Sequence, residues 1–171
     1  MTKEACQFIT PLTLQTLSAR RVYTDLFDLE DPHVVHTRLA EQANLVLVAP
    51  ATANVLGKLA HGLADDFLSC VVLATRAPIL IAPAMNVRMY GHRVVQENIR
   101  TLRRLGYHFI GPTVGSLACG YEALGHLADV EDIVRAVLQL LPRAQPIHGV
   151  EGKRASKTSA RAVRTRRARS P

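Results

Sequence analysis

Three apolar runs in this sequence each end at a proline and open directly into a short polar motif. The runs are "NLVLVAP" (44–50), "PILIAP" (78–83) and "HFIGP" (108–112), and they lead into "ATAN", "AMNVRM" and "TVGSLACG". Helix-like segments separate the runs, a pattern typical of parallel strands in one buried sheet. Ligands of an open α/β sheet bind outside the carboxyl ends of its strands. The sequence therefore predicts that five residues after the runs gather on one edge of the sheet. These residues are Thr52, Asn54, Asn86, Met89 and Cys119.

The segments between and around the runs predict helices. A helix over 10–19 begins at Thr10 as N-cap with a proline at its first position. Further helices are expected over 34–42, 54–74, 94–105 and 129–141, and a short strand over 21–24. We expect Asp65 and Asp66 to lie on an exposed face of the long helix over 54–74.

The charge of the chain is divided unevenly between its two parts. Residues 1–142 hold 12 Lys or Arg and 13 Asp or Glu, whereas residues 143–171 hold nine basic residues and one acid. We expect one folded domain over 1–142 and a basic, solvated tail over 143–171 without fixed structure. The tail has no aromatic residue, so the net charge of +7 does not favour a nucleic-acid partner.

Membrane insertion and metal binding are not expected from the composition. No apolar run approaches the ~20 residues that a membrane-spanning helix needs, and the first residues do not resemble a signal peptide. Cys6, Cys70 and Cys119 lie far apart, which favours reduced thiols in a cytoplasmic protein and gives no metal-ligand spacing.

The motifs "APATAN", "PAMNVRM" and "ACG", in this order, resemble those of the flavin-dependent cysteine decarboxylases. Within that family the match is best to the phosphopantothenoylcysteine decarboxylases, and it extends through "FITPLTLQTLS" and "VYTDLFD". The resemblance implies a flavodoxin-like α/β fold, with a doubly wound parallel sheet in three α/β/α layers. It also implies FMN as cofactor and a homotrimer or dodecamer. The implied reaction converts 4′-phospho-N-pantothenoylcysteine to 4′-phosphopantetheine in coenzyme A biosynthesis.

The resemblance also assigns roles to individual residues. It implies that His36 is the base, that Cys119 is the proton donor of the reductive half-reaction, and that Asn86 holds the substrate carboxylate. The further substrate contacts that it implies are Met89, Leu117 and Ala118. The implied FMN contacts are Thr2, Thr52, Ala53, Asn54, Val55 and Ala84.

Elementary chemistry is consistent with these roles. A carboxylate that leaves as CO2 is better held by a neutral amide, because a strong cation would stabilise the ground state as much as the transition state. Histidine titrates near neutral pH, and a thiol is acidic enough to return a proton to carbon. Two other interpretations stay open at this stage: His36 is a surface residue, with His33 as the alternative base, or Cys119 is a small buried apolar residue.

The sequence also departs from the family pattern. The family begins with a strand and a glycine-rich turn for the flavin phosphate, and this first βα unit is missing here, so we expect weaker FMN binding. His126 and Leu127 stand where the family has arginine and methionine. A ligase domain is expected on a separate chain. The alternative functions are a peptidyl-cysteine decarboxylase and a non-catalytic homologue or inactive fragment that binds partners.

Overall fold

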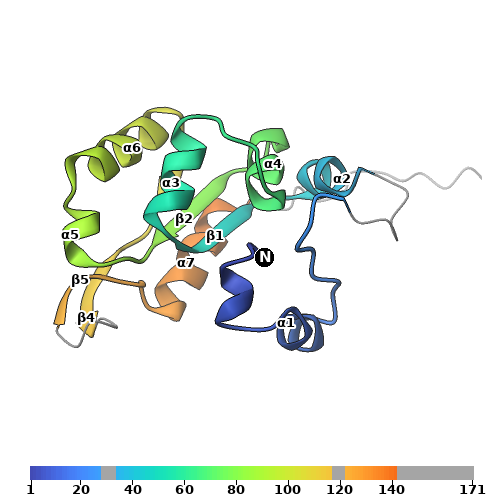
Figure 1. Cartoon of the computed structure of the whole chain (residues 1–171), viewed down its shortest axis with the longest axis horizontal. Helices are drawn as coiled ribbons and strands as arrows, with labels where there is room; N and C mark the ends of the chain where they lie inside the picture. Colours follow the sequence, from blue (N-terminus) through green and yellow to red (C-terminus); the bar gives the residue numbers. More distant parts are fainter. Residues whose placement is uncertain (28–33, 117–121, 142–171) are drawn as a thin grey trace, which may run out of the picture.

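A parallel sheet of three strands lies at the centre of the structure, a computed structural model that describes residues 1–27, 34–116 and 122–141 (Figure 1). The strand order is β1–β2–β3, and a separate antiparallel hairpin is formed by β4 and β5. The strands are β1 (Val46–Ala51), β2 (Ile79–Pro83), β3 (His108–Phe109), β4 (Thr113–Ser116) and β5 (Glu122–His126). The helices are η1 (Ala5–Gln7), α1 (Pro11–Ser18), α2 (Val35–Gln42), α3 (Ala53–Ala60), α4 (Phe67–Ala74), α5 (Val87–Tyr90), α6 (Arg93–Arg104) and α7 (Val130–Leu140).

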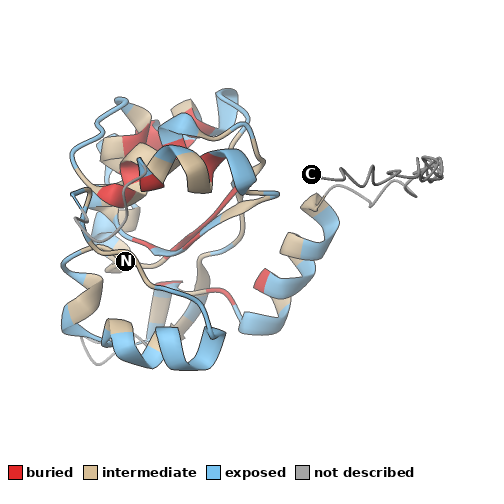
Figure 2. Cartoon of the chain, turned by 90° about the vertical axis from the view of Figure 1, so that its right-hand side faces the viewer, coloured by how far each residue is buried: buried red, intermediate tan, exposed pale blue. Residues whose placement is uncertain are grey.

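Strand β2 is buried along its whole length, because helices cover both faces of the sheet. Ile79 and Ile81 pack into the larger core, with residues of β1, α3, α4 and α6. Ala82 belongs to the smaller core, which it forms with Ala128 and with Ile133 of α7. Figure 2 shows the buried residues concentrated in the sheet and on the helices that lie against it. The predicted parallel sheet with helices on both faces is confirmed.

Several predicted boundaries are also confirmed. Helix α1 begins after Thr10, whose side chain accepts a hydrogen bond from the Thr13 N–H, and α6 ends just before Gly106. Gly106 has a φ of 90°, a conformation that glycine adopts without strain. The expected strand over 21–24 is wrong, since this segment pairs with no strand in the structure.

The long helix expected over 54–74 is wrong and is replaced by two helices. Helix α3 ends near Gly62, whose φ of 68° leaves the right-handed helical region. Helix α4 begins at Asp66 with a reciprocal capping box: Asp66 Oδ1 accepts from the Ser69 N–H, and the Ser69 hydroxyl accepts from the Asp66 N–H. The two signals were present in the sequence, but the apolar spacing across them suggested a continuous helix.

Asp66 also forms part of the ionic contact that joins α3 to α4. Lys58 Nζ lies 2.8 Å from a carboxylate oxygen of Asp66 and 2.8 Å from one of Asp65. The expectation that both aspartates lie on an exposed helix face is therefore wrong, since both precede α4 and Asp66 is only 28% exposed. Burial acts to raise the pKa of Asp66, but hydrogen bonds from Lys58 and Ser69 outweigh it, and the pKa lies below its ordinary value.

Within the described residues, no helix is both long enough and apolar enough to span a bilayer. The same residues contain no group of three His, Cys, Asp or Glu side chains that could hold a metal ion. The expected tail over 143–171 lies outside the described residues, so the division into domain and tail stays a prediction.

The Lys58–Asp66 contact predicts a pH-dependent loss of stability in one variant. Asp66→Asn keeps an oxygen to cap α4 but removes the charge, so urea unfolding at pH 7 should show a loss of about 1–2 kcal/mol. A carboxylate with a lowered pKa stabilises the fold above its unfolded pKa, and this contribution is lost as pH falls through the folded pKa. The difference between parent and variant should therefore shrink below about pH 4.

Glu97→Gln is the matched control, because Glu97 pairs with Arg100 on the exposed surface of α6. Its effect should be much smaller at every pH. An Asp66→Asn variant as stable as the parent at pH 7 would contradict the role given to this contact.

Candidate active site

Two loops meet at the carboxyl edge of the sheet. After β1, Thr52 caps α3, and its hydroxyl oxygen accepts a hydrogen bond from the Val55 N–H at 3.4 Å. After β2, the chain passes through Ala84 and enters α5 at Asn86. The Ala84 N–H donates to the carbonyl of Ala51 at 3.1 Å, so the two loops are joined directly. The predicted meeting of the "ATAN" and "AMN" motifs is therefore seen in the structure.

The Asn86 side chain is oriented by its own helix. Its Oδ1 accepts a hydrogen bond from the Arg88 N–H at 2.9 Å. The Nδ2 group is the hydrogen-bond donor of this amide. An amide donor of this kind can bind a carboxylate without placing a full positive charge beside it.

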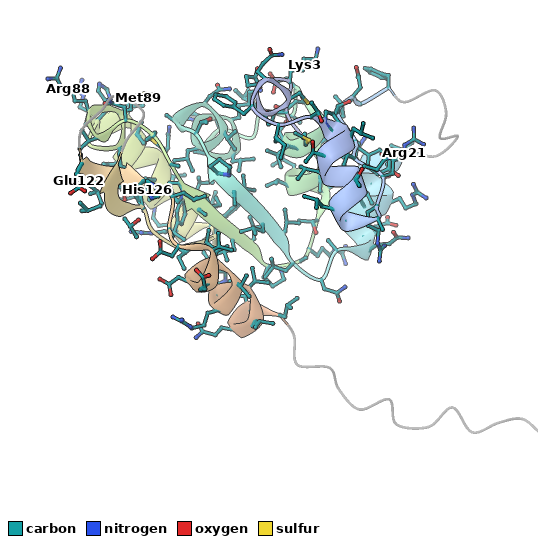
Figure 3. The ribbon with its side chains drawn as sticks, turned by 90° about the horizontal axis from the view of Figure 1, so that it is seen from below. Lys3, Arg21, Arg88, Met89, Glu122 and His126 are labelled. Carbon is teal, nitrogen blue, oxygen red and sulfur yellow. The ribbon has the colours of Figure 1, made fainter. Side chains whose placement is uncertain are left out.

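The β4–β5 hairpin packs against this loop from another side. The Met85 N–H donates to the carbonyl of Gly125 at 2.9 Å, and helix α5 lies against β5. Figure 3 shows Arg88 and Met89 of α5 at the same end of the molecule as Glu122 and His126 of β5. Met89 is half exposed there. The carboxyl edge is therefore bordered by β1, by the Asn86 loop and by the hairpin.

His36 does not lie at this edge. It belongs to α2, which lies at the opposite end of the domain from α5 (Figure 1). The His36 Nδ1 atom is buried and has no hydrogen-bond partner among the described residues. Within one chain, the structure thus brings Asn86 and Thr52 together but leaves the predicted base apart from them.

Other predicted residues have different outcomes. Leu117, Ala118 and Cys119 lie outside the described residues, as does His33, so their roles stay predictions. Thr2 is described, and its hydroxyl oxygen accepts a hydrogen bond from the Ala5 N–H at 3.2 Å.

The sequence patterns missed the hairpin and the part that Gly125 plays in it. The motif "TVGSLACG" by itself predicts only a polar segment after a strand. Glycines at 115 and 125 interrupt both arms, and they hide the alternation by which short strands are usually found. A glycine inside a strand does suggest a bulge or a close backbone approach, and that signal was available.

The first turn of α3 and the loop after β2 have groups that could hold an uncharged polar ring system. Thr52 and Asn54 are exposed neutral side chains, and the first N–H groups of a helix have no backbone partner inside it; of these, the Val55 N–H already donates to the Thr52 hydroxyl. Ala53 and Ala84 are small, so they leave room for a ligand beside these donors. Val55 follows in the same turn and is half-buried.

Comparison with known proteins connects this arrangement to a family. The Flavoprotein family profile matches residues 1–142. The coenzyme A biosynthesis bifunctional protein CoaBC of Bacillus subtilis is 54% identical over 136 residues, which are 79% of this chain and 34% of that protein. The probable phosphopantothenoylcysteine decarboxylase of Streptococcus mutans is 46% identical over 144 residues, covering 82% of this chain and 80% of that protein.

A solved structure agrees with these relatives. The FMN-dependent cysteine decarboxylase SpaF is 34% identical, with a TM-score of 0.70 over 82% of this chain and 77% of that chain. The similarity confirms the predicted fold class. The chain spans about a third of the length of the bifunctional relatives that it matches.

Proposed function

This chain belongs to the Flavoprotein family, and from that membership we propose that it catalyses the FMN-dependent decarboxylation of 4′-phospho-N-pantothenoylcysteine. The observation that carries the proposal is the direct backbone link between Ala84 and Ala51, which joins the Thr52 and Asn86 loops at the carboxyl edge. Such an edge is where α/β sheets bind their ligands. The similarity to the probable phosphopantothenoylcysteine decarboxylase of Streptococcus mutans and to the FMN-dependent cysteine decarboxylase SpaF supports both the substrate and the cofactor.

The residues at this edge fit FMN. The neutral groups of Thr52 and Asn54 and the first two N–H groups of α3 suit the polar edge of a flavin and its ribityl hydroxyls. The small side chains of Ala53 and Ala84 leave space beside them, and Val55 offers apolar contact. FMN, when bound, supplies the two-electron redox chemistry that this reaction needs.

We assign the substrate carboxylate to the Nδ2 group of Asn86. The hydrogen bond from Arg88 N–H to Oδ1 holds the amide in the orientation that presents this donor. A neutral donor orients the carboxylate without strongly stabilising its charge, so the electron pair of the breaking C–C bond can pass into the substrate as neutral CO2 leaves. Met89 is the proposed apolar contact next to it.

We assign proton removal from the substrate to His36. Since its Nδ1 is buried, Nε2 is the nitrogen that can accept a proton from a bound substrate. Helix α2, which contains His36, lies at the opposite end of the domain from α5, which Asn86 caps (Figure 1). Both residues can therefore serve one substrate only if they come from two copies of the chain. We therefore propose a homo-oligomer, a trimer or an assembly of trimers, with each site completed by a neighbouring copy.

The remaining roles follow the family resemblance. We propose that the Cys119 thiol returns a proton to carbon in the last step, and that Leu117 and Ala118 contact the substrate. A ligase on a separate chain is the proposed source of the cysteine-containing substrate, as suggested by the bifunctional relatives.

The proposal is tested with the full chain, FMN and 4′-phospho-N-pantothenoylcysteine under anaerobic conditions. CO2 release and a product with the mass of 4′-phosphopantetheine are expected. A peptide with a C-terminal cysteine is the comparison substrate and should react far more slowly. If the chain retains FMN and releases no CO2 from either substrate, it is not a decarboxylase.

Mixing two inactive variants should restore activity if each site is shared between copies. His36→Asn removes the base, and Asn86→Asp keeps the cap of α5 but repels the substrate carboxylate. Each should lose at least about 100-fold in rate. When the two are unfolded and refolded together in equal amounts, about a quarter of the sites should receive both intact residues from neighbouring copies.

Each variant refolded alone is the control, and mass spectrometry of the mixed assemblies verifies that copies have exchanged. Mixed assemblies without recovered activity would show that one copy supplies both residues, or that His36 is not the base.

Replacing the thiol should separate the two halves of the reaction. In Cys119→Ser the hydroxyl is too weak an acid to protonate carbon, so CO2 should still be released while an enethiol two hydrogens short of the product accumulates. In a single anaerobic turnover, the released CO2 is measured and the enethiol is identified by its mass. Cys70→Ser is the control, because Cys70 has no proposed role in the reaction. It lies on α4, where its thiol donates to the Ala64 carbonyl at 3.4 Å. Parent-level formation of 4′-phosphopantetheine by Cys119→Ser would refute the assignment.

A further inference from the structure

The hairpin meets the Asn86 loop through backbone atoms. The Met85 N–H donates to the Gly125 carbonyl at 2.9 Å, and Met85 is the residue directly before Asn86. On the other side of the same loop, the Ala84 N–H donates to the Ala51 carbonyl. Two consecutive amides of the loop are thus held by two different strands, β1 and β5.

Gly125 has no room for a side chain at this contact. A Cβ placed on it would lie 2.1 Å from the carbonyl oxygen of Met85 and 3.5 Å from the nitrogen of Val87. Its φ of 142° is also a conformation that L-residues with side chains rarely adopt. Any larger residue must push the hairpin away from the loop, because the obstructing atoms belong to the backbone and cannot rotate aside.

The strand register explains why the Gly125 carbonyl faces the loop. Thr113 pairs with His126, but the next residue, Val114, pairs with Leu124, so Gly125 is the extra residue of a β-bulge. A bulge turns the backbone of one strand locally and redirects its groups. Here the bulged residue is a glycine and has no side chain at the edge, and its carbonyl accepts a hydrogen bond from the Met85 N–H.

We propose that Gly125 is a positioning residue for Asn86, acting through the Met85 hydrogen bond and through the absence of a side chain. The consequence for catalysis rests on the proposed function, in which the Asn86 amide holds the substrate carboxylate. The link between hairpin and loop is independent of that function. Gly125 touches neither substrate nor cofactor in this proposal, and it acts by fixing where Asn86 stands.

The first measurement is amide hydrogen exchange in the full chain, which needs no activity. In Gly125→Ala the Met85 amide should exchange at least about tenfold faster than in the parent, because its acceptor is displaced. Gly106→Ala is the matched control: Gly106 also has a positive φ, but nothing lies within 4 Å of an added Cβ. It should leave exchange at Met85 unchanged. Unchanged exchange in Gly125→Ala would overturn the proposal.

The second measurement is steady-state kinetics with 4′-phospho-N-pantothenoylcysteine and saturating FMN. Gly125→Ala should lower kcat/KM by at least about tenfold, mainly through a higher KM, because a displaced amide binds the carboxylate poorly in ground and transition states alike. The affinity for FMN should stay within about twofold of the parent, since the Thr52 loop is held by β1. A loss shared equally by Gly106→Ala would indicate general destabilisation and would overturn the positioning role.

Thr113→Val provides a milder test if Gly125→Ala does not fold. The Thr113 hydroxyl donates to the Leu127 carbonyl at 3.2 Å at the base of the hairpin. Its loss should change Met85 exchange and KM in the same direction but by less. If the parent chain has no decarboxylase activity, the proposed function fails, whereas the exchange result still decides whether Gly125 fixes the loop.

Discussion

The burial of β2 on both faces is the constraint on which the rest of the structure depends. All five residues from Ile79 to Pro83 are buried, between β1 and β3 in the sheet and between helices above and below it. A strand enclosed in this way cannot shift its register without exposing apolar side chains on both faces. Its end is therefore fixed, and so is the loop that follows it. The position of Asn86 is a consequence of the packing of the core.

Much of this architecture could be predicted, because the signals were local or periodic. Continuous apolar runs predicted β1 and β2, and Thr10 and Gly106 predicted the limits of helices. The division between α3 and α4 was missed because apolar spacing was given more weight than Gly62 and Asp66, although these two residues interrupt the helix. The hairpin was missed because its glycines remove the alternation of side chains that indicates a strand. Gly125 is required there by a contact with Met85, which is distant in sequence and has no local signal.

The site was predictable to the extent that topology alone determines it. Parallel strands place their carboxyl ends on one edge, so the meeting of the Thr52 and Asn86 loops followed from the order of the elements. The place of His36 did not follow, because α2 precedes β1 and its location depends on packing against α4. The motif resemblance assigns His36 and Asn86 to one reaction, and only the three-dimensional arrangement shows that their helices, α2 and α5, lie at opposite ends of one chain. The proposed oligomer is what would bring His36 and Asn86 of different copies to one substrate.

Asn86 and Asp66 show why a sequence motif does not reveal which atom of a residue is functional. In Asn86, Oδ1 caps the start of α5, and Nδ2 is the donor in the proposed contact with the substrate carboxylate. In Asp66, one carboxylate oxygen caps α4 and the other meets Lys58. Each side chain therefore combines a local structural contact with a second interaction through a different atom. An amide and a carboxylate have nearly the same shape, so exchanging one for the other preserves the cap and changes only the charge and the donor. Chemical role and structural role can be separated at these positions, whereas truncation to alanine would remove both at once.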